Sequence, residues 1–477
     1  MNYYLAIDSG TSSVRSIIFD STFEIVSVAQ EELSLIYPEN GWVEQDPHEI
    51  IELQKKTIYN ALKNANISGD KIIACGITNQ RETTVIWDKK TGKPLYNAIV
   101  WQDRRTADFI ESIKGKYTDL IRNKTGLVPD PYFSASKIKW ILDRFNGNKD
   151  NLAFGTVDSW IMYNLVEGHP HLTDYSNASR TMLFDIIDLK WDDELLSLFD
   201  IPKNILPDVL DSNADFGSIK IDGFHIPVRG VLGDQQAALF GHKAISRGDV
   251  KVTYGTGAFI LFNTGNTPVF SKNNLLSTIA WVKNGKTTYA LEGSVFIAGA
   301  VIQWLRDKLN FFRESKESEL LASNSDSTGE VYFIPAFVGL GAPYWKPNIR
   351  GAIYGLTRDT GKAEITRAAI EGVAYLVNDM LTAMTNDTGD KIHKLFADGG
   401  MSKNNLFLQF QSDISDLIVK RPANIEVTAL GSVFMASGND KFSPKSAKEF
   451  IPAMDVNERK KKLNGWKNYM EKLIGKE

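Results

Sequence analysis

Residues 3–19, YYLAIDSGTSSVRSIIF, contain two apolar runs separated by a short polar turn. Tyr3–Ile7 and Val14–Phe19 are rich in aromatic and β-branched residues, which favour strands. Between them, Ser9–Ser13 combines a glycine with hydroxyl-bearing residues, a composition typical of a tight turn. The segment therefore predicts a β-hairpin.

The turn of this hairpin also carries groups that can bind phosphate. Successive backbone N–H groups of a glycine turn can wrap around phosphate oxygens, and the hydroxyls of Thr11, Ser12 and Ser13 add further donors. Arg15 adds a positive charge, and Asp8 could hold Mg²⁺ through water. A surface hairpin with a polar turn is the plain alternative, so this stretch alone leaves the ligand open.

The same pattern returns in the second half of the chain. Residues 251–262 again read as strand, glycine-rich turn and strand. Later, an apolar strand at Leu395–Ala397 precedes the diglycine Gly399-Gly400 and a helix over Asn404–Ser415, for which Ser402 is the expected N-cap. Three glycine–hydroxyl turns at strand ends favour a nucleotide-binding cleft more than any one of them does.

Strands and helices alternate along the chain, which predicts an α/β protein. Glu49–Ala65 has helical spacing of its apolar residues, and Lys71–Ile77 reads as a buried strand. Because the hairpin pattern occurs twice, we expect two similar domains, residues 1–243 and 244–477.

Two charged clusters follow predicted strands. Arg81 and Glu82 could bind hydroxyl groups by donating and accepting hydrogen bonds, or form a surface ion pair. Asp234 opens an apolar helix, where it could be an N-cap or a general base that takes a proton from a hydroxyl. Periodicity does not decide between these alternatives.

Composition excludes several classes of protein. The 477 residues carry 54 basic and 58 acidic side chains, a near balance that gives no reason to expect nucleic acid as a partner. The single cysteine, Cys75, excludes an internal disulfide and is expected in a buried strand.

The sequence contains no phosphate-binding Gly-x-x-x-x-Gly-Lys-Ser/Thr motif, no Gly-x-Gly-x-x-Gly after a strand and no Gly-x-Ser-x-Gly motif. No stable membrane insertion is expected, and we predict a cytoplasmic protein.

The residues collected so far resemble those of the FGGY-type carbohydrate kinase family, over almost the whole chain. The longest matching runs are Gly76–Thr84, Trp101–Arg105, Asp130–Ser134, Thr173–Thr181, Gly233–Gly241 and Gly339–Trp345. The resemblance implies an α/β fold of two ribonuclease-H-like (actin-like ATPase) domains with a cleft between them. The runs around Arg81 and Asp234 are most similar to those of members whose acceptor is glycerol rather than a larger sugar.

The resemblance also implies roles for individual residues. Asp234 would be the general base in an ATP-dependent phosphorylation of glycerol to sn-glycerol 3-phosphate. The implied glycerol-binding residues are Arg81, Glu82, Trp101, Tyr132, Asp234, Gln235 and Phe259. The implied ATP contacts are Thr11, Ser12, Ser13, Arg15, Thr256, Gly299, Gln303, Gly400, Met401 and Asn405, and Asp8 would hold Mg²⁺. A homodimer or homotetramer is expected from the family alone.

Three other functions fit some of the same residues. A kinase for another polyol, a triose or a pentulose would keep the fold and change the acceptor. An ATP-switch protein of the actin or chaperone type would need the hairpins but no acceptor site, so Arg81, Glu82 and Asp234 argue against it. A glycosidase with paired carboxylates would leave the glycine–hydroxyl turns without a purpose.

Overall fold

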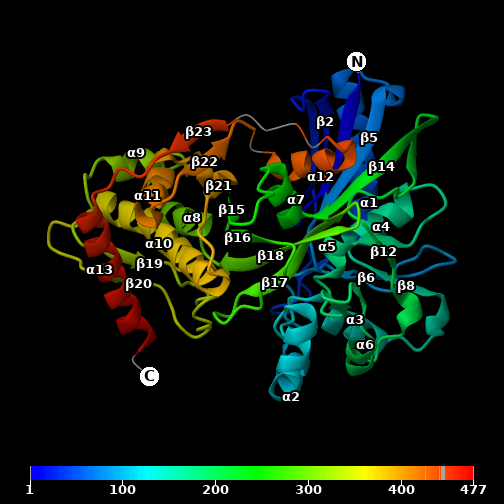
Figure 1. Cartoon of the computed structure of the whole chain (residues 1–477), viewed down its shortest axis with the longest axis horizontal. Coiled ribbons are helices and arrows are strands. Elements are labelled where there is room, and N and C mark those ends of the chain that lie inside the picture. The colour runs from blue at the N-terminus through cyan, green and yellow to red at the C-terminus, as the bar shows by residue number, and fades with distance from the viewer. Residues whose placement is uncertain (1, 425, 440, 442–445, 476–477) are drawn as a thin grey trace.

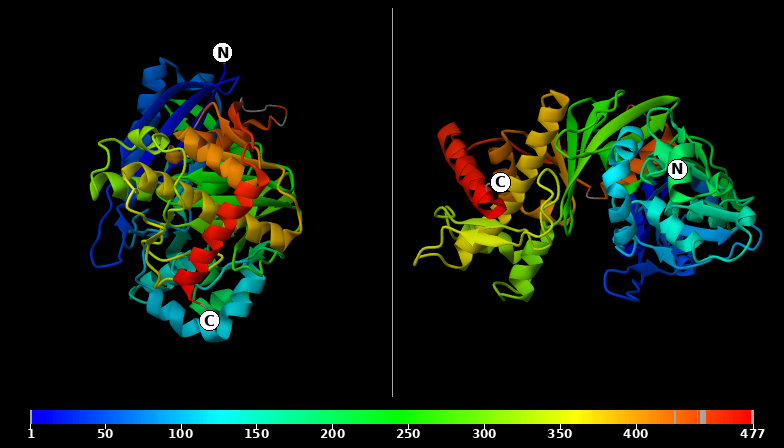
Figure 2. Two further views of the ribbon diagram at one scale, coloured as in Figure 1. Left: turned by 90° about the vertical axis from the view of Figure 1, so that its left-hand side faces the viewer. Right: turned by 90° about the horizontal axis from the view of Figure 1, so that it is seen from below.

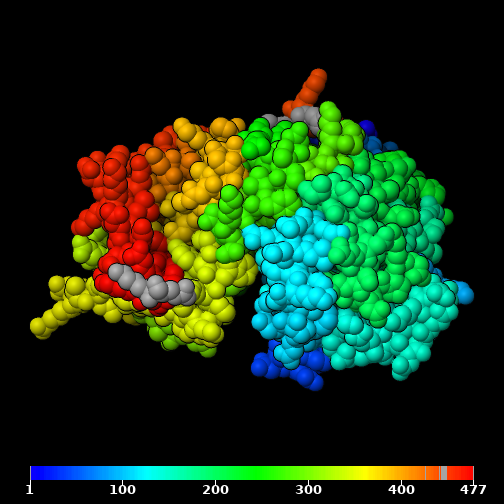
Figure 3. All heavy atoms as spheres, turned by 60° about the horizontal axis from the view of Figure 1, so that its bottom comes forward, coloured from blue at the N-terminus to red at the C-terminus, as the bar shows by residue number. Residues whose placement is uncertain are grey.

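The computed structural model describes residues 2–424, 426–439, 441 and 446–475. Two large mixed sheets form the centres of two lobes, with the N-terminus in one lobe and the C-terminus in the other (Figures 1 and 2). In the space-filling view, the lobes are separated by a notch between the cyan and yellow parts of the chain (Figure 3). The predicted α/β architecture of two similar halves is confirmed.

The first sheet has six strands in the order β13-β14-β5-β1-β2-β3. Its strands are β1 (Tyr3–Ser9), β2 (Ser13–Asp20), β3 (Ile25–Glu32), β5 (Ile72–Asn79), β13 (Ser218–Ile221) and β14 (Phe224–Gly233). The predicted hairpin is present, since β1 pairs antiparallel with β2, and β1 pairs parallel with β5 on its other side. Cys75 lies buried in β5, as expected.

The second sheet has seven strands in the order β17-β18-β16-β15-β21-β22-β23. Its strands are β15 (Asp249–Tyr254), β16 (Ala258–Gly265), β17 (Leu276–Lys283), β18 (Lys286–Val295), β21 (Lys394–Asp398), β22 (Val419–Pro422) and β23 (Ser446–Phe450). β15 pairs antiparallel with β16 and parallel with β21, which repeats the pairing of β1 with β2 and β5. The second hairpin inferred from the sequence is therefore confirmed.

Within the described residues, helices and five two-stranded sheets surround these centres. The helices are α1 (Pro47–Ala65), α2 (Ala107–Thr125), α3 (Ser134–Leu142), α4 (Val157–Leu165), α5 (Tyr175–Ala178), α6 (Asp193–Phe199), α7 (Asp234–Gly241), α8 (Gly299–Asp307), α9 (Glu317–Ser323), α10 (Lys362–Thr388), α11 (Asn405–Ser415), α12 (Val427–Ser437) and α13 (Val456–Ile474). The small sheets pair β4 (Glu44–Gln45) with β7 (Ala98–Ile99), β6 (Val85–Asp88) with β8 (Leu152–Gly155), β9 (Leu172–Asp174) with β12 (Asp208–Leu210), β10 (Phe184–Asp185) with β11 (Lys190–Trp191), and β19 (Tyr332–Ile334) with β20 (Ala352–Tyr354). No helix of the described residues is long and apolar enough to cross a membrane.

The central strands of the first sheet, β1, β2 and β5, are buried on both faces. Leu5 and Ile7 of β1 pack in the core that includes α1, whereas Ala6, which points the other way, packs in the core that includes α7 and α12. That second core also contains Leu261 and Trp281 of the other sheet. Helices α7 and α12 therefore lie between the two sheets and join the halves.

One prediction needs correction in the second half. Ser402 does not cap α11: Asn404 does, accepting a hydrogen bond from the backbone N–H of Phe407, while the Ser402 hydroxyl donates to the Gly399 carbonyl at 2.7 Å. Helix α12 belongs to the second half by sequence, yet it packs on the first sheet, against β5 and β14. The division at residues 243 and 244 stays a proposal with this exception.

The contact between α7 and α12 depends on glycine. A Cβ on Gly431 of α12 would lie 1.8 Å from the carbonyl oxygen of Ala237 in α7, and a Cβ on Gly241 would lie 2.2 Å from the Val427 carbonyl oxygen. Such distances are impossible for real carbon atoms, so the two backbones can approach this closely only at glycines.

We expect Gly431→Ala to destabilise the protein by about 1–3 kcal/mol, because α7 and α12 must move apart to accept the methyl group. The control is Gly115→Ala, also inside a helix, where a Cβ would meet no atom within 4 Å. That change should stabilise the helix by roughly 0.5–1 kcal/mol. Urea unfolding of both variants measures the difference, and a G431A variant as stable as wild type would contradict this account of the helix contact.

Candidate active site

Arg81 and Asp234 are brought together by two parallel neighbouring strands. β5 ends at Asn79 and β14 ends at Gly233, and these two residues are register partners. The residues that follow the two strands therefore lie close together, at the carboxyl ends of the strands. Arg81 Nε consequently lies 3.2 Å from Asp234 Oδ1. A Cβ on Gly233 would lie 2.8 Å from the Arg81 side chain, so glycine is required here.

Asp234 is the first residue of α7, and it does not cap that helix. Gly233 occupies the N-cap position, and Asp234 Oδ1 instead accepts a hydrogen bond of 2.7 Å from the backbone N–H of Gln235. The N-cap alternative is therefore wrong. The Asp234 side chain is 32% exposed, which leaves its carboxylate open to a small molecule.

Arg81 and Glu82 are buried, so they are not a surface ion pair. Their side chains are only 2% and 1% exposed, and they approach each other no closer than 4.0 Å. Glu82, three residues after the end of β5, adopts a positive φ of 62°, in the left-handed region. Its Oε1 accepts a hydrogen bond of 2.6 Å from Nε of Arg180, whose side chain has no exposed surface.

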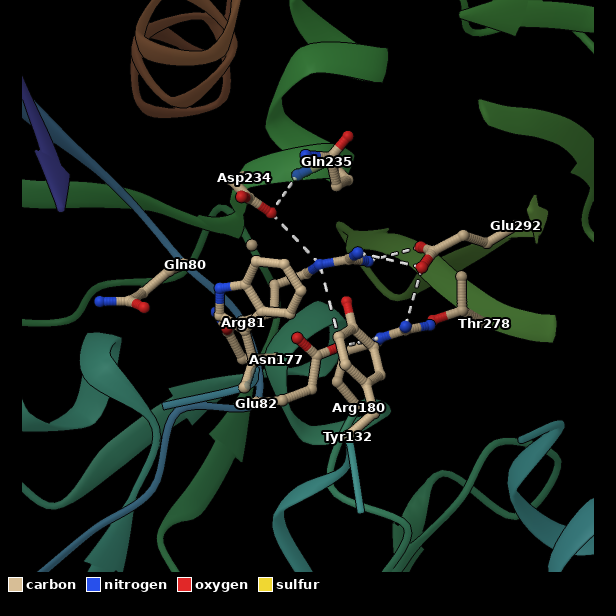
Figure 4. A network of polar contacts seen from close by, with 12 residues as sticks. Gln80, Arg81, Glu82, Tyr132, Asn177, Arg180, Asp234, Gln235, Thr278 and Glu292 are labelled. Atoms are coloured by element: carbon tan, nitrogen blue, oxygen red, sulfur yellow. Dashed lines mark hydrogen bonds and ion pairs between the residues drawn. The ribbon is translucent and has the colours of Figure 1, made fainter. Parts of the chain in front are cut away.

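Glu292, on β18, binds two arginines at once (Figure 4). It accepts hydrogen bonds from both terminal nitrogens of Arg81, at 2.5 and 3.0 Å, and from Nη2 of Arg180 at 2.8 Å. Burial alone would raise the pKa of Glu292, but the charges of Arg180 and Arg81 lower it to about 2. Glu292 is therefore ionised at every pH at which the protein is expected to work.

Asp234 has a proton affinity that lies near neutrality. Its partial withdrawal from water raises its pKa to about 6, even though the neighbouring cations Arg81 and Lys251 act in the opposite direction. The negative charge of Glu82 adds to the rise. A carboxylate with this pKa is ionised at pH 7 and can accept a proton.

Three aromatic side chains form a wall, and one of them, Tyr132, lies close to Glu82 and Arg81. Trp101 packs edge to face against Tyr132 and Phe259, with ring centroids 5.5 and 6.3 Å apart. The Trp101 indole N–H donates a hydrogen bond of 2.9 Å to the Thr11 hydroxyl, which ties the wall to the first hairpin. Phe259 comes from β16, so this wall contains residues of both halves.

Gln235 is held by a buried lysine. Lys251 on β15 donates hydrogen bonds to Oε1 of Gln235 and, at 3.0 Å, to the Thr253 hydroxyl. Burial lowers the pKa of Lys251 to about 8, although Asp398 and Asp234 oppose the change. Because Lys251 fixes the Gln235 oxygen, the amide nitrogen is left as the group that can donate to a ligand.

Two glutamine side chains hold the backbone of the first hairpin turn in place. Gly10 N–H donates to the Ser13 carbonyl at 3.0 Å and closes the turn. Gln80 donates to the Gly10 carbonyl at 3.1 Å, and Gln45 donates to the Thr11 carbonyl at 2.6 Å. Thr11, Ser12 and Ser13 are at least partly exposed, so their hydroxyls are candidates to donate to a phosphate.

The two charged residues that flank this turn bind each other. Arg15 forms an ion pair with Asp8 and a second one, at 2.5 Å, with Glu426, which precedes α12. Asp8 is 3% exposed, and Ser12 is the exposed residue of the turn. The predicted phosphate-binding groups are thus together, but Arg15 already has two carboxylate partners.

The second hairpin lies against the start of α8. Gly299 N–H donates to the Gly255 carbonyl at 2.9 Å, and Ala300 N–H donates to the Thr256 carbonyl at 3.1 Å. A Cβ on Gly299 would lie 2.6 Å from the Gly255 oxygen, so this approach also requires glycine. Gln303 follows one turn later in α8 and is exposed.

The diglycine after β21 completes the second cluster. Thr253 of β15 and Asp398 of β21 are register partners, so the diglycine turn and the second hairpin lie at the same sheet edge. A Cβ on Gly400 would meet nothing within 4 Å, which leaves space for a flat ring. Met401 is buried beside it. Asn405 donates from its backbone and side-chain nitrogens to Glu319, at 3.1 and 3.2 Å.

Sequence reasoning missed three charged residues of the site: Arg180, Glu292 and Lys251. Glu292 and Lys251 each interrupt an apolar strand, and a charge in such a strand is rarely buried without a partner. A charged residue inside an apolar strand was therefore the sequence signal that could have identified Glu292 and Lys251 as site residues. Arg180 lies inside the matching run Thr173–Thr181, where no property of the residue itself distinguishes it.

Comparisons with known proteins agree with this geometry. Residues 3–241 match the N-terminal domain, and residues 250–438 the C-terminal domain, of the FGGY family of carbohydrate kinases. Glycerol kinase of Natranaerobius thermophilus is 49% identical over 99% of both chains. Glycerol kinase of Salmonella paratyphi B is 48% identical over 99% of this chain and 98% of its own.

Solved structures show the same fold. A crystal structure of Plasmodium falciparum glycerol kinase with ADP superimposes with a TM-score of 0.93 at 36% identity, over 100% of this chain and 99% of that one. Xylulose kinase from Lactobacillus acidophilus gives a TM-score of 0.88 at 23% identity, over 99% of this chain and 97% of that one, which supports the fold alone. The actin-like α/β fold and the resemblance seen in the sequence are thus confirmed, and the chain belongs to the FGGY family of carbohydrate kinases.

Proposed function

We propose that this chain transfers the γ-phosphoryl group of ATP to glycerol and forms sn-glycerol 3-phosphate. The supporting observation is the pairing of Asp234 with Arg81 at 3.2 Å, beside an aromatic wall that spans both halves. A partly exposed carboxylate with a pKa of about 6 suits a base that activates a hydroxyl. The relatives named above as glycerol kinases indicate which hydroxyl compound it is.

Glycerol has three hydroxyls and a short carbon edge, and the site offers partners for both. Hydrogen-bonding groups come from Arg81, Glu82, Tyr132, Asp234 and Gln235, and apolar contact comes from Trp101 and Phe259. Buried polar groups discriminate strongly, because an analogue that lacks one hydroxyl leaves its partner unpaired. The pocket would therefore favour polyols over simple alcohols.

In the reaction, a terminal hydroxyl of glycerol loses its proton to Asp234 while its oxygen attacks the γ-phosphorus. The bond from that phosphorus to the β,γ-bridging oxygen breaks, and ADP leaves. Catalysis of this kind consists mainly of positioning and charge neutralisation. The hairpin turns at residues 10–13 and 255–257 would hold the phosphates through N–H and hydroxyl groups.

The residues fit a magnesium ion that arrives with the nucleotide. Among the described residues, no group of three or more acidic, histidine or cysteine side chains forms a metal cage. Mg²⁺ commonly binds through one or two carboxylates, with phosphate oxygens and waters as the remaining ligands. Asp8, next to the last residue of β1, would supply such a carboxylate once Arg15, its ion-pair partner, turned to the phosphates. The bound ion would neutralise charge on the β- and γ-phosphates.

The experiment that tests the proposed function measures ADP formation from Mg·ATP by the purified chain. Glycerol is compared with xylulose, ribulose, erythritol and dihydroxyacetone, and with no acceptor. ADP release chiefly with glycerol, and glycerol 3-phosphate as product, supports the proposal. Faster turnover of a sugar would reassign the acceptor pocket, and release without any acceptor would favour an ATP-switch protein.

Asp234→Asn should lower kcat for glycerol by about 10²–10⁴-fold, because the amide cannot accept the proton. ATP binding, measured by calorimetry, should change little. The matched control is Asp215→Asn, a change of the same kind at a side chain that is 65% exposed. Turnover by D234N within threefold of wild type would exclude Asp234 as the base.

The pH dependence of kcat/KM should show an acid limb near pH 6. Asp234 must be ionised to act as a base, so activity is present above its pKa of about 6 and falls as pH drops through that value. Below the limb, log kcat/KM should decrease by about one for each pH unit. A limb near pH 4, the ordinary value for aspartate, would show that burial does not tune this carboxylate.

Assembly and location stay proposals. We expect a homodimer or homotetramer, as the family resemblance implies, and a cytoplasmic protein, as predicted from the sequence. Size-exclusion chromatography with light scattering tests the first, and cell fractionation tests the second.

A further inference from the structure

Five charged side chains form a continuous chain of alternating sign at the base of the site (Figure 4). In order, they are Glu82, Arg180, Glu292, Arg81 and Asp234. Successive members are 2.6, 2.8, 2.5 and 3.2 Å apart. The first four are at most 3% exposed, and only Asp234 reaches the solvent.

Arg81 is shared between two carboxylates. Its two terminal nitrogens bind Glu292, and its Nε edge faces Asp234. Nη1 also donates to Gln236 Oε1 at 3.2 Å. The guanidinium is planar and its donors form a rigid fork, so a bidentate grip by Glu292 fixes the direction in which Nε points.

We propose that Glu292 and Arg180 are positioning residues for the phosphoryl transfer proposed above, on which this inference rests. Glu292 binds the two terminal nitrogens of Arg81 and partly neutralises its positive charge. Arg81 can then orient Asp234 through Nε without binding it too strongly. Arg180, in turn, takes up part of the charge of Glu292 and anchors Glu82.

The position of Glu292 in the chain gives this role a second consequence. Glu292 lies on β18, in the second half, whereas its two arginine partners follow β5 and α5 in the first half. The orientation of Arg81 therefore depends on the two halves being correctly docked.

The charges around Asp234 set the direction of the expected effects. Arg81 and Glu82 face it from the end of β5, and Lys251 faces it from β15. Without the charge of Glu292, the Arg81 cation would act more fully on Asp234 and lower its pKa below about 6. Without the charge of Arg180, Glu292 would neutralise Arg81 more completely and Glu82 would lose its partner, so the pKa of Asp234 would rise.

The test is the acid limb of log kcat/KM in two variants. Glu292→Gln should move it down by about one pH unit, and Arg180→Met should move it up by a similar amount. In E292Q, kcat should also fall about tenfold or more, because the base is weaker and less well oriented. The controls are E292D and R180K, which keep the charges and should keep the limb near pH 6.

Folding of each variant is checked by circular dichroism and by ADP binding. If E292Q does not fold, the shift of the acid limb in R180M tests the inference alone. If R180M does not fold, the shift in E292Q does so. A limb that stays in place in a folded, active variant, or one that moves the same way in E292Q and R180M, would overturn the inference. A purely structural role would lower stability without these opposite shifts. Failure of the proposed function is distinct, since wild type would then release no ADP in response to glycerol.

Discussion

Arg81 carries a permanent positive charge that is almost completely withdrawn from water, and the site is arranged around it. Its side chain is 2% exposed, and an isolated charge at such a position would be strongly unfavourable. Glu292 supplies two hydrogen bonds and a compensating charge, and Asp234 takes the remaining edge of the guanidinium. Removing one member of such a buried network is far more costly than its net contribution to stability suggests.

This constraint links the architecture to the chemistry. Parallel pairing of β5 with β14 brings Arg81 and Asp234 to one edge of the first sheet, while β18 brings Glu292 from the second. Helices α7 and α12, in contact through Gly431 and Gly241, pack between the sheets. Phe259 of the second half also meets the aromatic wall of the first. The proposed acceptor site is therefore made jointly by both halves of the chain.

Much of this could be predicted from the sequence because it is encoded locally. The hairpin at residues 3–19 and its repeat at residues 251–262 follow from strand propensity and glycine turns. The site residues Arg81 and Asp234 follow strands, where ligand-binding groups of α/β proteins commonly lie. The family resemblance then assigned roles that periodicity had left open.

The errors and omissions have a common physical origin in tertiary contacts. Nothing in the local sequence shows that Glu292 lies next to Arg81 and Arg180, since strand β18 meets them only after the halves dock. Helix α12 leaves its own half for the same reason: its small residues fit the surface of the first sheet. Ser402 and Asn404 are both good N-caps by composition, and the short turn after Gly399 decides between them.

A ¹³C NMR titration of the Asp234 carboxyl carbon, in protein labelled at aspartate and with D234N to assign the signal, measures directly whether this network tunes the carboxylate. We expect a pKa of about 6, because the carboxylate is partly withdrawn from water beside an Arg81 whose charge Glu292 already shares. Titration near pH 4 would contradict it, since Asp234 would then be an ordinary surface carboxylate with no special ability to accept a proton at neutral pH.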